Sequence, residues 1–87
     1  MRAAVIREHG DIDNILIEED FPEPELESGW ARIAVKATSL NYHDIFSRRG
    51  MPGIQLPLPL VIGSDIAGEV VEVASDVKGV RTGDRVL

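Results

Sequence analysis

The sequence predicts a mainly β domain, α+β by strict count, that contains one short helix. Apolar and polar residues alternate with a period of two over residues 30–38, which is typical of a half-buried strand. Two runs rich in β-branched residues, 2–7 and 14–19, flank a set of turn formers. Helical spacing is found at residues 42–49, and a chain of 87 residues has room for a single domain.

The first elements are expected to be a hairpin and a long strand. Residues 2–7 and 14–19 should pair, because residues 9–13 between them favour turns. His9 in this turn is interpreted as an ordinary surface residue. After an acidic loop, residues 30–38 should form a strand with one buried face and one charged face.

The helix is expected to run from Tyr42 to Arg49. Asn41 is a good N-cap, an acid such as Asp44 is favourable in the first turn, and Gly50 suits the position just past the helix end. Three apolar residues at positions i, i+3 and i+4 form a stripe that should pack into the core. These residues are Tyr42, Ile45 and Phe46.

The second half of the chain begins with an irregular segment. Residues 50–62 contain three of the five prolines and should be extended, and their apolar side chains could form a lip for a substrate. Residues 66–74 should be a strand with a bulge near Val70 and Val71, because two of its glutamates are three positions apart. A further strand begins in residues 84–87, so the chain is expected to be truncated at its C-terminal end.

Composition excludes several classes of partner and site. The formal net charge is −6, without a basic stripe, so neither nucleic acid nor an anionic membrane is expected as a partner. The absence of cysteine excludes disulfides and thiolate zinc ligands within these residues. The longest apolar stretch is interrupted by prolines, which argues against a membrane span. We expect a cytoplasmic protein.

Short motifs add little chemistry by themselves. The glycines never form GxGxxG or GxxxxGK[ST], so no phosphate-binding loop is predicted. The two histidines do not stand at spacings that define a Ser/His/Asp arrangement.

Five separate elements together carry a more specific signal. They are Leu40-Asn41-Tyr42-x-Asp44, Arg49-Gly50, the proline-rich loop, Gly63-x-Asp65-x-x-Gly68-x-Val70 and Gly83-Asp84-Arg85-Val86. In this order and spacing they resemble the N-terminal, GroES-like catalytic domain of the medium-chain dehydrogenase/reductase superfamily, especially its quinone-oxidoreductase-like branch.

The resemblance implies a GroES-like, partly open β-barrel, here incomplete over residues 1–87, that packs against a Rossmann domain absent from this sequence. It implies NADPH or NADH as the cofactor of the parent protein, with a small-molecule carbonyl or quinone as substrate. A parent of this kind is also expected to be a homo-oligomer. By itself the chain should be inactive, since the Rossmann half holds the cofactor.

The resemblance also bears on metal binding. In zinc alcohol dehydrogenases the position of Asn41 is a cysteine ligand, and the position of Ser64 is a histidine ligand. An amide and a hydroxyl are poor zinc ligands by comparison. No catalytic zinc and no other metal site are therefore expected.

The candidate site residues cluster at the predicted helix start. Asn41, His43 and Asp44 are the catalytic candidates, and Asn41 and Tyr42 are the candidates for cofactor contact. Asn41 could donate a hydrogen bond to developing oxyanion charge, or serve only as an N-cap. His43 could relay a proton, or be an exposed helical histidine. Asp44 could be only an acid favourable to the helix start, and Tyr42 only a core residue.

Two functions remain open from the sequence. The first is the N-terminal substrate-side domain of an NAD(P)H-dependent oxidoreductase, such as a quinone, enone or enoyl reductase or an alcohol dehydrogenase-like enzyme. The alternative is a non-enzymatic GroES-like binding or assembly module.

Overall fold

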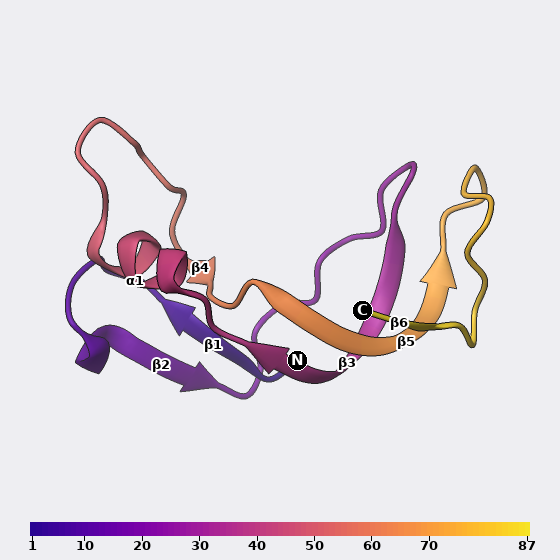
Figure 1. Ribbon diagram of the computed structural model, residues 1–87, viewed down its shortest axis with the longest axis horizontal. Helices are drawn as coiled ribbons and strands as arrows, with labels where there is room; N and C mark the ends of the chain where they lie inside the picture. Colours follow the sequence, from indigo (N-terminus) through magenta and orange to yellow (C-terminus); the bar gives the residue numbers. More distant parts are fainter. The chain divides into compact units, whose positions relative to one another are not determined.

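The computed structural model describes all residues, 1–87, and divides into two compact units. The first unit comprises Met1–Glu23 and Leu40–Ser64, and the second comprises Pro24–Ser39 and Asp65–Leu87. The strands and the helix, labelled in Figure 1, are β1 Ala3–Ile6, β2 Ile15–Glu18, β3 Ala31–Ser39, α1 Tyr42–Arg49, β4 Leu60–Val61, β5 Asp65–Val73 and β6 Arg85–Val86. A 3-10 turn, Ile12–Asn14, precedes β2. The prediction of a mainly β domain with one helix is confirmed.

The first unit is built on an antiparallel sheet in the order β2-β1-β4. The predicted hairpin is confirmed, with Ala3 paired to Glu18 and Ile6 paired to Ile15. The central strand β1 carries the apolar core of this unit, because Val5 and Ile6 are fully buried. Burial of these side chains against their neighbours stabilises the position of the strand on which the rest of the unit is built.

Helix α1 has the predicted bounds, Tyr42–Arg49. Gly50 ends it with φ 87°, a left-handed conformation that glycine adopts at no steric cost, and its N–H donates to the Phe46 carbonyl at 2.8 Å. The turn of the hairpin is tied to the same end of the helix, since the Gly10 N–H donates to the Arg48 carbonyl at 2.9 Å.

The predicted burial of the apolar stripe is wrong for two of its three residues, since only Ile45 is half-buried. Tyr42 is 75% exposed and Phe46 is 43% exposed, and their rings meet edge to face with centroids 5.3 Å apart. The buried residue of the helix is instead Asp44, at 7% exposure. The helix therefore turns its carboxylate inward, where hydrogen-bond donors meet it, and its aromatic residues outward.

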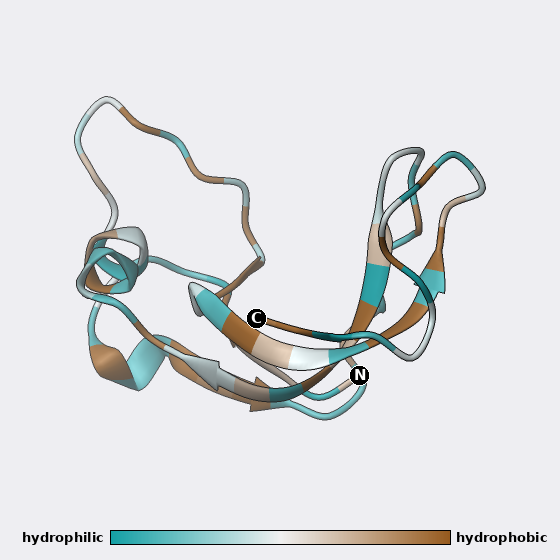
Figure 2. Cartoon of the chain, turned by 45° about the vertical axis from the view of Figure 1, so that its right-hand side comes forward, coloured by the Kyte–Doolittle hydropathy of each residue, from teal (hydrophilic) through white to brown (hydrophobic).

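Residues 50–62 are irregular, as predicted. Met51 and Ile54 form one isolated bridge, and the two-residue strand β4 pairs with β1 at the edge of the sheet. Hydrophobic colour recurs along the loop between α1 and β4 in Figure 2. The structure thus combines apolar side chains with a backbone that makes few regular pairings.

The second unit is an antiparallel sheet in the order β3-β5-β6. The predicted bulge is confirmed, because Arg32 pairs with Glu72 and Ile33 pairs with Val70, which leaves Val71 unpaired. Gly68 on β5 lies so close to β3 that a Cβ atom there would stand 2.4 Å from the Ala34 carbonyl oxygen.

The expected alternation of a buried and a charged face over residues 30–38 is not found, because residues 31–34 are all half-buried and residues 35–38 are all exposed. Val35 is 52% exposed, and the fully buried residue of this unit is Val70 on β5. A period of two assigns residues to faces, but a face is buried only where another element covers it. Neither three-stranded sheet closes into a barrel.

The isolated chain is expected to be a marginal monomer. The buried apolar side chains are Ala3, Val5, Ile6 and Val70 alone, so we expect a free energy of unfolding below about 5 kcal/mol. The edge strand β6 should add a tendency to associate. Thermal melting followed by circular dichroism, combined with size-exclusion chromatography, measures both properties. A sharp transition at high temperature from a monomeric sample would contradict this expectation.

Candidate functional site at the start of helix α1

The candidate site forms where the segment after β4 meets the start of α1. Strand β4 pairs with β1, and the Ile62 N–H donates to the Ala4 carbonyl at 3.1 Å, so the chain that follows is held near the helix. Gly63 and Ser64 then contact α1 directly. The predicted catalytic residues Asn41, His43 and Asp44 are all in this region of the first unit.

The Asp44 carboxylate is the centre of the cluster. The Asn41 N–H donates to its Oδ2 at 2.8 Å, as part of a capping box at the helix start. The Gly63 N–H donates to Oδ1 at 3.2 Å, and the Ser64 hydroxyl donates to Oδ2 at 2.6 Å. One buried carboxylate thus satisfies donors from the helix start and from the segment after β4.

Burial alone would raise the pKa of Asp44, because it disfavours the charged carboxylate. Hydrogen bonds from Ser64, Asn41 and Gly63, together with the nearby His43, outweigh burial and hold the pKa of Asp44 below its usual value. The carboxylate is therefore ionised at neutral pH and can only accept hydrogen bonds.

His43 joins the cluster through its imidazole. The side chain is exposed, and its Nε2 lies 2.6 Å from the Ser64 hydroxyl oxygen. Ser64 consequently bridges His43 and Asp44, at 2.6 Å from each. The structure brings together Asn41, His43 and Asp44, whereas the exposed ring of Tyr42 lies against Phe46.

Sequence reasoning missed two residues that the structure ties to α1. Ser64 was considered only as the position of a lost zinc ligand, although it holds His43 and Asp44 together. His9 was interpreted as an ordinary surface residue, which is wrong. It is half-buried, and its Nδ1 lies 3.0 Å from the Ser47 carbonyl and 3.3 Å from the Arg48 carbonyl in the last turn of α1. The last carbonyls of a helix need hydrogen-bond partners, but the 38 positions between His9 and Ser47 leave no local sequence signal for this contact.

Comparison with known proteins places this chain in a family. Residues 27–87 match the alcohol dehydrogenase GroES-like domain. This chain belongs to that family.

The relatives of this GroES-like domain include a dehydrogenase-like protein and an oxidoreductase. It is 37% identical over 87 residues to a zinc-type alcohol dehydrogenase-like protein of Schizosaccharomyces pombe, and the match covers 100% of this chain and 25% of that protein. It is 38% identical over 87 residues to a chloroplastic NADPH-dependent alkenal/one oxidoreductase of Arabidopsis thaliana, with 99% of this chain and 22% of that protein covered. The domain therefore spans about a quarter of the length of these curated relatives.

Comparison with solved structures supports the same family assignment. The quinone oxidoreductase from Coxiella burnetii superposes with a TM-score of 0.87 at 34% identity, covering 98% of this chain and 28% of that one. The identification with the medium-chain dehydrogenase/reductase superfamily and its quinone-oxidoreductase-like branch is confirmed.

The donor atoms of this GroES-like domain do not fit a catalytic zinc. The positions compared with zinc ligands carry the amide of Asn41 and the hydroxyl of Ser64, and that hydroxyl already donates to Asp44. Residues 1–87 contain no group of three or more His, Cys, Asp or Glu side chains placed to hold a metal ion.

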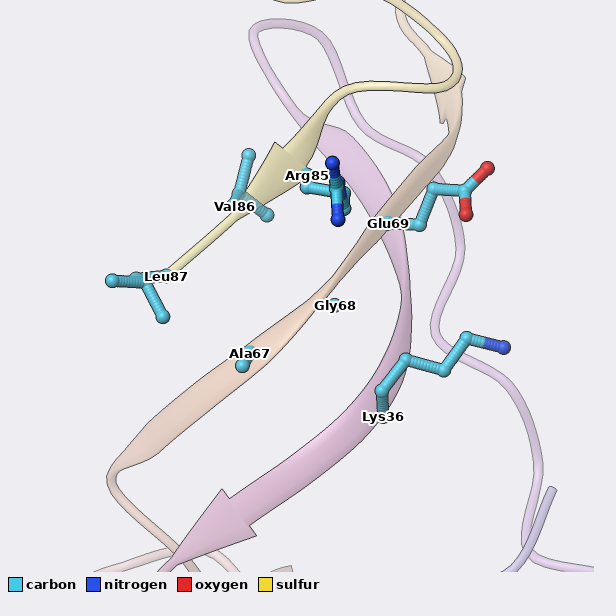
Figure 3. Close-up of a pocket in the computed structure, with 7 residues that line it drawn as sticks. All are labelled: Lys36, Ala67, Gly68, Glu69, Arg85, Val86 and Leu87. Carbon is cyan, nitrogen blue, oxygen red and sulfur yellow. The ribbon is translucent and has the colours of Figure 1, made fainter.

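Two hollows lie outside the cluster. In the first unit, residues between Met51 and Leu58 line a hollow of about 510 Å³ together with His9 and Arg49, where the apolar lip was predicted. In the second unit, a hollow of about 340 Å³ lies along β5 and β6, with Lys36 at its margin (Figure 3). The use of the lip by a substrate stays a prediction. No helix in the structure has the length and apolar character needed to cross a membrane.

The Asp44 network predicts a specific pH dependence of stability. Because the native pKa of Asp44 is below its unfolded value of about 3.9, its ionised form stabilises the fold above that pH. This contribution is lost as the pH falls through the native pKa. The free energy of unfolding of the wild type should therefore exceed that of Asp44→Asn most near pH 7, and the gap should narrow below about pH 4.

Urea titrations at several pH values measure this gap. Asp20→Asn, which removes an exposed carboxylate, is the matched control and should change the free energy of unfolding little. A gap between wild type and Asp44→Asn that does not vary with pH would contradict the role given to the Asp44 carboxylate.

Proposed function

We propose that this chain is the N-terminal substrate-side domain of an NAD(P)H-dependent oxidoreductase that acts on a small-molecule carbonyl or quinone. The Arabidopsis relative, an NADPH-dependent alkenal/one oxidoreductase, supports the reaction class. The chain matches only about a quarter of such proteins, which supports a separate cofactor-binding domain. The assignment of residues 1–87 to one incomplete domain is part of this proposal.

The observation that carries the proposal is the polar cluster of Asn41, His43 and Asp44 at the start of α1. When bound, the reduced nicotinamide supplies a hydride to an electrophilic carbon of the substrate. Negative charge then develops on the substrate oxygen, and a nearby donor lowers the energy of that state. Asn41 can donate through its side-chain amide, and the imidazole of His43 can deliver a proton.

The remaining candidates have different roles. Asp44 is buried and accepts hydrogen bonds from the cluster, so we assign it to positioning rather than to contact with substrate. Tyr42 is the proposed cofactor contact together with Asn41. Tyr42 is 75% exposed, and its ring meets that of Phe46 edge to face, so an exposed aromatic side chain is available to the planar nicotinamide ring. No catalytic zinc is included, because the amide and hydroxyl donors do not suit it.

Expression of the complete reading frame tests the proposal. NADPH and NADH oxidation should be measured against a quinone, an alkenone, an enoyl thioester and an aldehyde, before and after chelation of metals. We expect reduction of at least one of these substrates, retained after chelation. A folded product that oxidises neither cofactor with any of them would favour the non-enzymatic binding or assembly module. Homo-oligomerisation, cytoplasmic location and the absence of nucleic-acid or membrane partners stay predictions.

The 87-residue chain alone is expected to be inactive and to bind NADPH only weakly. It contains no glycine-rich turn leading into a helix N-terminus, the feature that holds a dinucleotide pyrophosphate. Fluorescence titration with NADPH measures the affinity, and the complete reading frame is the positive control. Micromolar binding by the 87 residues would contradict the expectation.

Asn41→Ser separates the capping role of Asn41 from its proposed catalytic role. Serine is a comparable N-cap, so the fold should be preserved, while the amide donor is lost. In the complete reading frame we expect kcat to fall about 100-fold, the usual cost of losing one oxyanion donor. Steady-state kinetics and circular dichroism measure the two effects, and unchanged kcat in a folded Asn41→Ser variant would leave Asn41 as a cap only.

A further inference from the structure

The short contacts of Ser64 fix where the hydrogens of the cluster lie. Ser64 Oγ is 2.6 Å from Asp44 Oδ2 and 2.6 Å from His43 Nε2, and each distance requires one hydrogen between the two atoms. A serine hydroxyl has one hydrogen and two lone pairs, whereas an ionised carboxylate has none to give. The serine hydrogen therefore points to Asp44, and the hydrogen toward His43 must come from the imidazole.

We infer that Ser64 is a positioning residue that commits Nε2–H of His43 to a hydrogen bond and leaves Nδ1 as the atom that exchanges a proton with substrate. The catalytic part of this inference rests on the proposed function, whereas the location of the imidazole hydrogen does not. In the reduction, the Nδ1–H bond of the imidazolium breaks as an O–H bond forms at the substrate oxygen. The neutral imidazole that remains keeps its Nε2–H on Ser64, and the step transfers a proton without net electron transfer.

The structure provides an internal reference with the opposite assignment. Nδ1 of His9 faces the carbonyl oxygens of Ser47 and Arg48, which can only accept. The hydrogen of neutral His9 must therefore lie on Nδ1, and its Nε2 must carry the lone pair. The two histidines of this chain should therefore carry their hydrogens on different ring nitrogens, and one spectrum can show both.

Long-range ¹H–¹⁵N correlation spectra of histidine-labelled protein from the complete reading frame test the assignment. They are recorded at about pH 9, well above the ordinary histidine pKa of about 6.5, and assigned with His43→Gln and His9→Gln. We expect Nε2–H in His43, with a proton protected from exchange with water, and Nδ1–H in His9. A His43 ring with its hydrogen on Nδ1 would overturn the inference by itself.

Variants of Ser64 test whether the hydroxyl is the cause. Ser64→Ala should abolish the protection of the His43 Nε2–H proton, and Ser64→Thr should restore it because the hydroxyl returns. The matched control is Ser47→Ala, since Ser47 donates to the His43 backbone carbonyl at 3.3 Å and not to the ring. It should leave the imidazole signals unchanged. If Ser64→Ala does not fold, the wild-type and Ser64→Thr spectra still decide the matter, and an unprotected Nε2–H in both would overturn the inference.

Kinetics then separate the positioning role from the proposed function. His43→Gln should lower kcat about 100-fold and Ser64→Ala about 10-fold, and the double variant should be no slower than His43→Gln. If the double variant instead shows the product of the two single reductions in kcat, Ser64 does not act through His43. If the complete reading frame has no reductase activity, the proposed function fails, while the spectra still test the hydrogen bond.

Discussion

The Asp44 carboxylate is the constraint on which the described site depends. A buried ionised carboxylate is unfavourable unless donors surround it, and here the donors come from the helix start and from the segment after β4. The same contacts set the first turn of α1, fix the backbone at Gly63 and direct the Ser64 hydroxyl. His43 is then placed by Ser64, so an exposed member of the cluster depends on the buried Asp44.

Polar contacts, more than apolar packing, determine how helix α1 is oriented. Val5 and Ile6 fix the strand β1, but the helix beside it buries no apolar residue. Its rotation is set by the inward carboxylate, and this rotation leaves Tyr42 and Phe46 exposed. A helix oriented in this way leaves the aromatic side chains and the imidazole of His43 exposed.

Local chemistry in the sequence predicted the helix well, because Asn41, Asp44 and Gly50 act within their own turns. The contact of Ser64 with His43 could not be predicted, since 21 positions separate them and the pairing of β4 with β1 brings them together. The motif comparison drew attention to Ser64, but for the loss of a zinc ligand. The predicted burial of Val35 was wrong because periodicity indicates which residues share a face of the strand, and not whether another element covers that face.

The helix is anchored at both ends by groups other than its aromatic residues. Asp44 ties its first turn to Ser64, while His9 and Gly10 tie its last turn to the hairpin. The exposed pair of Tyr42 and Phe46 takes no part in either anchor. A substitution at either position would therefore alter the exposed aromatic surface of α1, while both anchors of the helix, and with them the place of His43, stay unchanged.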